Sequence, residues 1–128
     1  MLVLVAWQSA GMAQAPVYGG KTITIIAGTK AGDVYDSYAH LFAQHLPKYI
    51  PGNPNIIVQN MPGAGSMLAG GRFGRPYVLP PGTPADRATI IRQAFQKVLA
   101  DESVIAEAKK RRLEFDPTAG HDLEKLAK

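Results

Sequence analysis

Two short β-branched segments, each followed at once by a glycine loop, constrain the fold of this chain more than any other feature. Residues 22–27 (Thr-Ile-Thr-Ile-Ile-Ala) and 56–58 (Ile-Ile-Val) have the composition of buried strands. The first segment continues into residues 28–33, the second into residues 60–66, and a helix start follows each loop. This order predicts two parallel strands whose glycine loops lie at helix N-termini, along one edge of the sheet.

The remaining patterns extend this to an α/β fold with a small, mostly parallel sheet and flanking helices. Residues 33–46 predict a helix with an apolar face, because Tyr35, Tyr38, Ala39, Phe42 and Leu46 recur at helical spacing, with Asp36, His40 and Gln44 on another face. Thr83 is the expected N-cap of a further helix, and Asp101 of the next. Residues 77–79 and 113–115 are candidates for short strands.

Length and composition favour one globular domain. The chain has 128 residues, of which 46% are hydrophobic and 19% charged, and this length allows one modest core. Cysteine is absent, so the chain has neither a disulfide framework nor thiol chemistry. Residues 1–15 are typical of a signal peptide, with a short apolar core and an Ala-Gln-Ala cleavage pattern, although the charged start is missing. A native apolar N-terminal tail is the alternative.

An anion site is the first functional hypothesis for the edge where the two glycine loops meet. Open α/β sheets bind ligands at the carboxyl ends of their strands, and helix N-termini favour negative charge. In the second loop, Gly63 and Gly65 let the backbone approach a ligand, and Ser66 adds a hydroxyl. The alternative is a turn whose glycines only reverse the chain.

Three motifs give the chain a resemblance to a known family. They are Ala-Gly-Asp-Val-Tyr-Asp at 31–36, Gln-Asn-Met-Pro-Gly-Ala-Gly-Ser at 59–66, and Arg-Pro-Tyr-Val-Leu-Pro-Pro-Gly-Thr-Pro at 75–84. The chain resembles the N-terminal and C-terminal parts of the periplasmic solute-binding receptors of tripartite tricarboxylate transporters. In that family a long region separates these parts and contains the second lobe. Here it is absent, with the join near residues 69–73.

The resemblance implies a truncated periplasmic-binding-protein-like lobe and a transport function. Residues 1–15 would be the signal peptide, 16–72 the βαβα part of the ligand-binding lobe, and 73–128 a C-terminal helical segment packed on the same lobe. The expected role is a non-enzymatic, cofactor-free periplasmic receptor that captures a small organic carboxylate and delivers it to membrane permease subunits. Backbone N–H groups of the second loop would hold the ligand carboxylate. The implied ligand-binding residues are Thr29, Gly32, Asp36, Asn60, Gly63, Ala64, Gly65 and Ser66.

The role of Asp36 stays open within this hypothesis. It matches the aspartate that the family carries at the start of this helix. Two carboxylates repel each other, so Asp36 is expected to hold a loop or an ordered water rather than touch an anion. The other interpretation is an acidic residue that simply favours the first turn of a helix. Lys30 can add a cation to the same turn.

Other chemistries fit less well. The Gly63-Ala64-Gly65 sequence begins a dinucleotide fingerprint, but Leu68 stands where a third small residue is needed. His40 and His45 are five residues apart, and Asp36 with His40 gives only two metal ligands. The basic run at 109–112 predicts no nucleic-acid site, because the positive excess is spread over both halves of the chain.

Two alternative functions therefore accompany the receptor hypothesis. One is a non-functional remnant or a self-associating interaction module, because apolar surface left by the missing lobe would drive self-association. The other is a nucleotide-binding α/β enzyme. No catalytic constellation supports the enzyme, since Ser37 and Ser66 lie in no nucleophile elbow.

Overall fold

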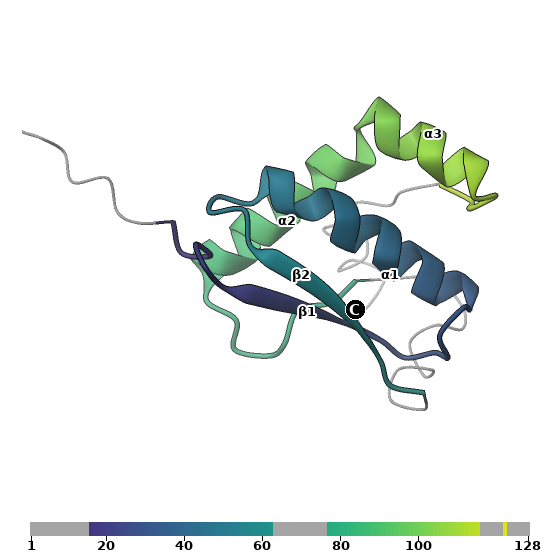
Figure 1. Ribbon diagram of the computed structural model, residues 1–128. Helices are drawn as coiled ribbons and strands as arrows, with labels where there is room; N and C mark the ends of the chain where they lie inside the picture. Colours follow the sequence, from purple (N-terminus) through teal and green to yellow (C-terminus); the bar gives the residue numbers. More distant parts are fainter. Residues whose placement is uncertain (1–15, 63–76, 116–121, 123–128) are drawn as a thin grey trace, which may run out of the picture.

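The protein is an α/β domain, as the sequence predicts. The computed structural model describes residues 16–62, 77–115 and 122. Within these residues, three α-helices and one short 3-10 helix lie beside a two-stranded parallel sheet (Figure 1). The elements in chain order are β1 (Thr22–Ala27), α1 (Val34–His45), η1 (Leu46–Tyr49), β2 (Asn55–Asn60), α2 (Ala85–Leu99) and α3 (Glu102–Lys110).

The two strands end side by side. β1 pairs in parallel with β2 over their whole length, with Thr22 opposite Asn55 and Ala27 opposite Asn60. Met61 extends the pairing one step further by donating its backbone N–H to the Ala27 carbonyl, at 2.8 Å. The loop that leaves β1 and the loop that leaves β2 therefore start from the same edge of the sheet, where open α/β sheets bind ligands.

Helix α1 connects the strands and covers one face of the sheet. It begins one residue after Asp33, whose carboxylate accepts the Tyr35 backbone N–H at 3.2 Å, and it ends just before Pro47, as predicted. The alternation of the strands turns Ile23, Ile25 and Ile56 towards this side. The opposite face carries only exposed residues, namely Thr22, Thr24, Ile26, Asn55, Ile57 and Gln59.

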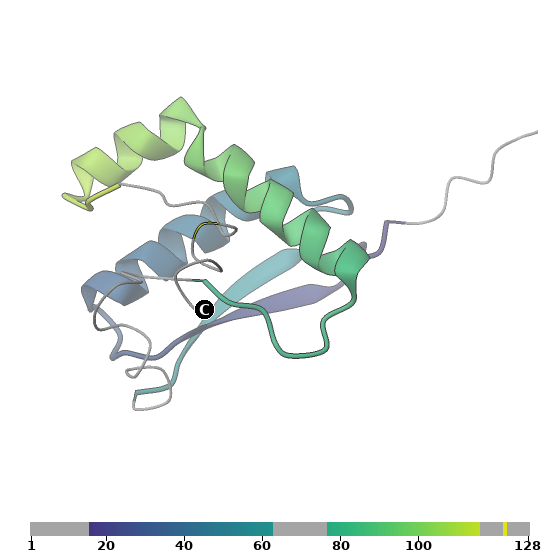
Figure 2. The same cartoon turned by 180° about the vertical axis from the view of Figure 1, so that it is seen from behind.

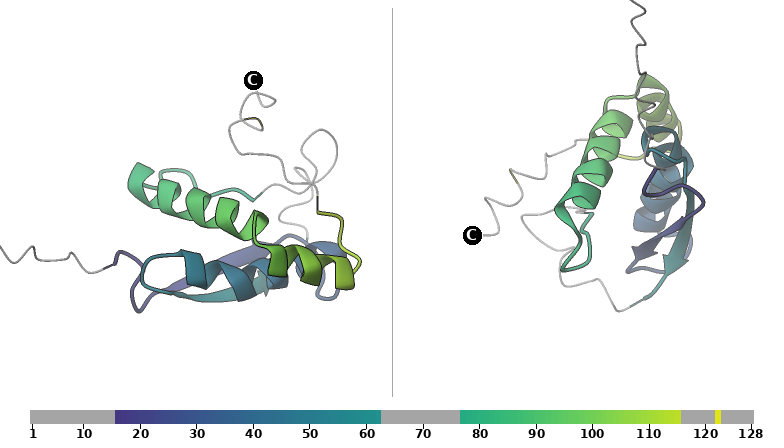
Figure 3. Two further views of the ribbon diagram at one scale, coloured as in Figure 1. Left: turned by 90° about the horizontal axis from the view of Figure 1, so that it is seen from above. Right: turned by 90° about the vertical axis from the view of Figure 1, so that its left-hand side faces the viewer.

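The C-terminal helices complete the core on the α1 side. Figure 2 shows α2 crossing α1 while α3 lies alongside it, and Figure 3 gives the same helices from two further sides. The Phe42 ring of α1 lies 5.0 Å from the Phe95 ring of α2, measured between centroids. Leu41, Val98 and Val104 are the largest side chains fully removed from solvent. Residues from both parts of the chain thus share one apolar core.

Two short strands expected from the sequence do not form. Residues 77–79 and 113–115 have no strand pairing. The Tyr77 ring instead packs 4.9 Å from the Phe42 ring, while the following Val78 is 71% exposed. Leu113 donates its N–H to the Ala108 carbonyl at 2.9 Å and so closes the end of α3. Apolar composition at 77–79 and alternation at 113–115 predicted strands, but Tyr77 packs on the core and the Leu113 backbone N–H caps α3.

The N-cap predicted for α3 is confirmed, and the one predicted for α2 is wrong. Asp101 caps α3 as expected, because its carboxylate accepts the Ser103 backbone N–H at 2.9 Å. Thr83 does not cap α2: Pro84 is the N-cap, and the Thr83 hydroxyl donates backwards to the Pro80 carbonyl at 2.7 Å. The turn preceding the helix satisfies the hydroxyl, so the predicted cap does not form.

One glycine is required by a close approach of two turns. Gly52, before β2, has φ +97°, and a Cβ there would lie 2.5 Å from the Gly19 backbone nitrogen before β1. Backbone at that distance cannot move aside like a side-chain tip, so Gly52 fixes how the chain enters both strands.

The expected signal peptide, residues 1–15, lies outside the described residues. In the part of the chain that is described, no helix has the length and apolar character needed to span a bilayer.

Candidate functional site

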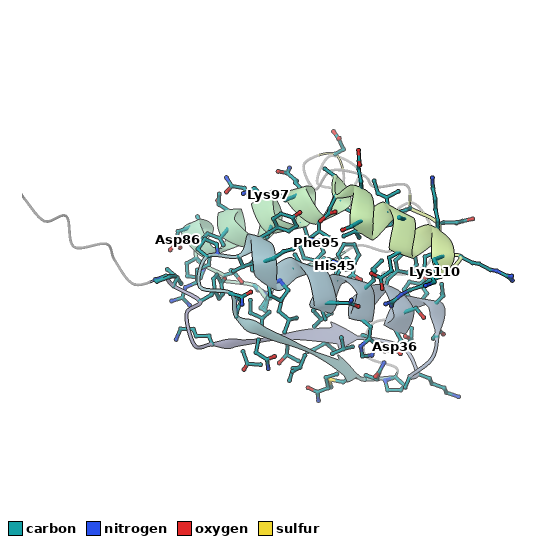
Figure 4. All side chains as sticks on the ribbon, turned by 45° about the horizontal axis from the view of Figure 1, so that its top comes forward. Asp36, His45, Asp86, Phe95, Lys97 and Lys110 are labelled. Atoms are coloured by element: carbon teal, nitrogen blue, oxygen red, sulfur yellow. The ribbon has the colours of Figure 1, made fainter. Side chains whose placement is uncertain are left out.

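The two strand ends are joined by one carboxylate. Asp36, in the first turn of α1, lies beside the ends of both strands (Figure 4). One of its oxygens accepts the backbone N–H of Gly32, from the loop after β1, at 2.8 Å. The other accepts the side-chain amide of Asn60, the last residue of β2, also at 2.8 Å. Asp36 is only 6% exposed, and its two partly buried bonds hold the loop after β1 to the end of β2.

The surroundings of Asp36 keep its carboxylate charged. The Gly32 N–H donor is the main cause that lowers the pKa of Asp36, and the Asn60 amide lowers it further, against the opposing effect of burial. His40 adds a smaller lowering effect one turn later, where its Nε2 lies 3.3 Å from the Asp36 carboxylate. Since the His40 side chain is 58% exposed, it forms the outer border of the cluster.

Four of the eight predicted ligand-binding residues lie among the described residues. Gly32, Asp36 and Asn60 are brought together by the bonds above. Thr29 lies in the same loop as Gly32, and its hydroxyl is buried without a hydrogen-bond partner among the described residues. Such orphaned hydroxyls are uncommon and call for an explanation at each occurrence. Gly63, Ala64, Gly65 and Ser66 lie outside the described residues.

The hydrogen bonds decide between the interpretations of Asp36. The sequence left two roles open for Asp36. The structure shows that its carboxylate holds a loop, because it accepts the Gly32 N–H. The Gly32 N–H and the Asn60 side-chain amide are therefore directed to the protein's own carboxylate. Gly32 has φ +85° and open space around a hypothetical Cβ, so its glycine is required by backbone conformation. The site carries a negative charge at Asp36 and a Thr29 hydroxyl that no described residue bonds.

A second polar cluster joins η1 to α3. Asp101 accepts hydrogen bonds from the Tyr49 hydroxyl, at 2.7 Å, and from the Lys48 ammonium, while its other oxygen binds Ser103. These bonds, that from Lys48 first, hold the pKa of Asp101 well below its usual range. The hydrogen bond that each makes to Asp101 raises the pKa of Lys48 and the pKa of Tyr49. Its acceptors are all used within the chain, so this cluster fastens the helices and offers no site.

His45, at the end of α1, and Arg111, in the basic run at the end of α3, also have partners within the chain. His45 Nε2 lies 2.8 Å from a Glu107 oxygen, and Arg111 pairs with Glu107 one turn away. Arg111 also reaches the Gln44 side-chain oxygen at 3.3 Å. No local sequence pattern predicts the His45 contact, which joins residues 62 positions apart. Within the described ranges, no group of three or more His, Cys, Asp or Glu is arranged to hold a metal ion.

Comparison with protein-family models, with curated proteins and with solved structures finds no match for this chain. The geometry of the strand-end cluster and the sequence motifs are therefore what a functional proposal has to rest on.

Proposed function

We propose that this protein is a solute-binding protein that captures a small organic carboxylate at the edge formed by the ends of β1 and β2. One observation carries the proposal: Asp36 ties the loop after β1 to the end of β2 and builds one polar site from two chain segments. The Thr29 hydroxyl supports it, because a ligand or an ordered water supplies the partner that this buried oxygen lacks within the described residues.

The resemblance to receptors of tripartite tricarboxylate transporters supplies the biological context of the proposal. The protein is exported to the periplasm, loses residues 1–15, and hands its ligand to membrane permease subunits. N-terminal sequencing of the protein released from the periplasm of a Gram-negative host tests the export step. A mature chain that starts at Pro16 agrees with it, and an intact Met1 in the cytoplasmic fraction contradicts it.

Binding is tested by a thermal-shift titration with citrate, succinate and malate. We expect a saturable rise of the melting temperature, because a ligand that binds only the folded state stabilises it by mass action. Asn60→Ala removes the amide at the strand end and reduces the rise. Gln59→Ala is the matched control: Gln59 is the preceding residue, exposed on the opposite face of the sheet, and its variant keeps the rise. No rise with any carboxylate refutes the proposal.

Thr29→Val gives an independent test of the same site. Val has nearly the shape of Thr and lacks the hydroxyl, which makes no bond to the described part of the chain. We expect unchanged or slightly higher stability in the free protein, since a buried polar group without a partner is costly. Binding of the carboxylate is expected to weaken. A variant that is clearly less stable yet binds normally shows that the hydroxyl has a structural role instead.

Self-association is a second candidate, favoured by the uncovered face of the sheet. Parallel sheets are usually buried on both faces, yet here Ile26 is 58% and Ile57 46% exposed. The exposed residues of this face include no charged side chain, although the chain carries a net charge of +4. A neutral face meets its own copy without like-charge repulsion, so a second copy of this chain is the partner that we infer.

Light scattering coupled to size exclusion tests this second candidate. We expect a dimer whose mass falls to that of a monomer in the double variant Ile26→Thr, Ile57→Thr. Val78→Thr is the control, because Val78 is more exposed than either residue and lies outside the sheet. A wild-type protein that stays monomeric at high concentration contradicts the candidate.

A further inference from the structure

Asn60 presents a fixed orientation of its side-chain amide. An ionised carboxylate only accepts hydrogen bonds, so an amide beside it has to present its NH₂ group. The Asn60 Nδ2 lies 2.8 Å from the Asp36 carboxylate, and Asp36 is held ionised by the Gly32 N–H. The amide oxygen, Oδ1, is consequently directed away from Asp36.

The amide oxygen of Asn60 is available as an acceptor. No described residue donates a hydrogen bond to it, and the Asn60 side chain is only partly buried at the end of β2. An acceptor at that position pairs with a hydroxyl or an ammonium group and gains nothing from a methylene group. A site built to bond a ligand donor discriminates strongly against the analogue that lacks it.

We propose that Asn60 selects carboxylates that carry a hydroxyl or ammonium group near the carboxylate, and that Asp36 is the positioning residue that sets the direction of the Asn60 amide. This inference rests on the proposed function and deepens it, because it names the class of ligand. The negative charge of Asp36 nearby favours the ammonium over the hydroxyl.

The inference is tested by calorimetric titration of the full chain with three ligands of one carbon skeleton. Succinate has no donor, L-malate adds a hydroxyl and L-aspartate adds an ammonium group. We expect malate or aspartate to bind at least about tenfold more tightly than succinate. A tenfold difference in affinity corresponds to the net free energy of one good hydrogen bond. The order of malate and aspartate identifies the preferred donor.

Two variants locate the preference. Asn60→Ala removes the acceptor, and the affinity ratio is expected to fall to about one. Asp36→Asn replaces the fixed acceptor by an amide that also donates, so the Asn60 amide is free to turn and the ratio falls as well. Gln59→Ala keeps the wild-type ratio. A merely structural role of Asp36 would weaken all three ligands equally and leave the ratio unchanged.

Each outcome decides the matter. Equal affinities for succinate, malate and aspartate overturn the inference and leave the proposed function standing. A preference for malate or aspartate that survives in Asn60→Ala also overturns it, since another group then supplies the acceptor. If none of the three ligands nor citrate binds, the proposed function fails together with the inference. Because the ratio is measured first on the wild-type protein, the test does not depend on the folding of either variant.

Discussion

Asp36 and Asp101 are two aspartates at helix starts with opposite uses. Asp101 is the N-cap of α3 and binds partners that are mostly exposed, including Lys48 and Ser103. Asp36 lies in the first turn of α1, is itself buried, and binds the loop after β1 and the end of β2. Asp101 caps its helix and fastens it to η1, whereas Asp36 joins the loop before its helix to the end of β2.

Removing the Asp36 carboxylate is expected to have the largest effect. Asp36→Ala leaves the Gly32 N–H and the Asn60 amide without their partner, at a cost of about 2 kcal/mol in the free energy of unfolding. Urea denaturation measures this. The control is Asp33→Ala, which removes the exposed N-cap of the same helix and costs about 1 kcal/mol. Equal losses for the two variants contradict the special role of Asp36.

Asp101→Ala is expected to lower the urea midpoint by less than Asp36→Ala. The exposed Lys48 and Ser103 groups that it releases form hydrogen bonds with water instead, and the loss is limited to the cap and the Tyr49 contact. Tyr49→Phe isolates the Tyr49 part. If Asp101→Ala is the more damaging variant, attachment of α3 matters more to the fold than the link between the strand ends.

Acid sharpens the comparison because both aspartates have lowered pKa values in the folded state. Each therefore adds stability that is present above its ordinary pKa of 3.8 and is lost as the pH falls through the lowered value. We expect the wild-type urea midpoint to drop steadily below that pH. In Asp36→Asn and in Asp101→Asn, the urea midpoint is expected to fall less steeply below that pH than in the wild type. If a variant loses stability in acid as the wild type does, the replaced aspartate does not have a lowered pKa in the folded state.

Salt is expected to give the smallest difference. The Lys48 side chain is 46% exposed, so about 1 M NaCl screens its attraction to Asp101. The stability difference between wild type and Lys48→Met should shrink at that salt concentration. The difference between wild type and Asp36→Ala should persist, because hydrogen bonds inside the domain are screened far less. A loss of both differences in salt would place the Asp36 cluster at the surface.

Local patterns predicted much of the fold. The β-branched runs gave both strands, helical spacing gave α1, and Asp101 was recognised as a cap because capping depends on residues only two positions away. Residues 77–79 and 113–115 were wrongly predicted as strands, since neither apolar composition nor alternation reveals whether a neighbouring strand exists to pair with.

The candidate site was only partly predictable. Gly32, Asp36 and Asn60 were selected as site residues, but helical spacing placed Asp36 on a polar face with His40, and the structure buries it. Its bond to Asn60 joins residues 24 positions apart, which no local pattern encodes. The contact depends on the parallel register that sets the end of β2 beside the end of β1.

The central claim is that the edge joined by Asp36 is where a carboxylate binds. A ¹⁵N-labelled protein titrated with L-malate and followed by two-dimensional NMR tests it most directly. We predict saturable shifts of the Gly32 backbone amide and the Asn60 side-chain amide, while the amides of α3 stay in place. Shifts confined to Lys110 and Arg111, at the basic end of α3, would contradict the claim, as would a spectrum that malate leaves unchanged.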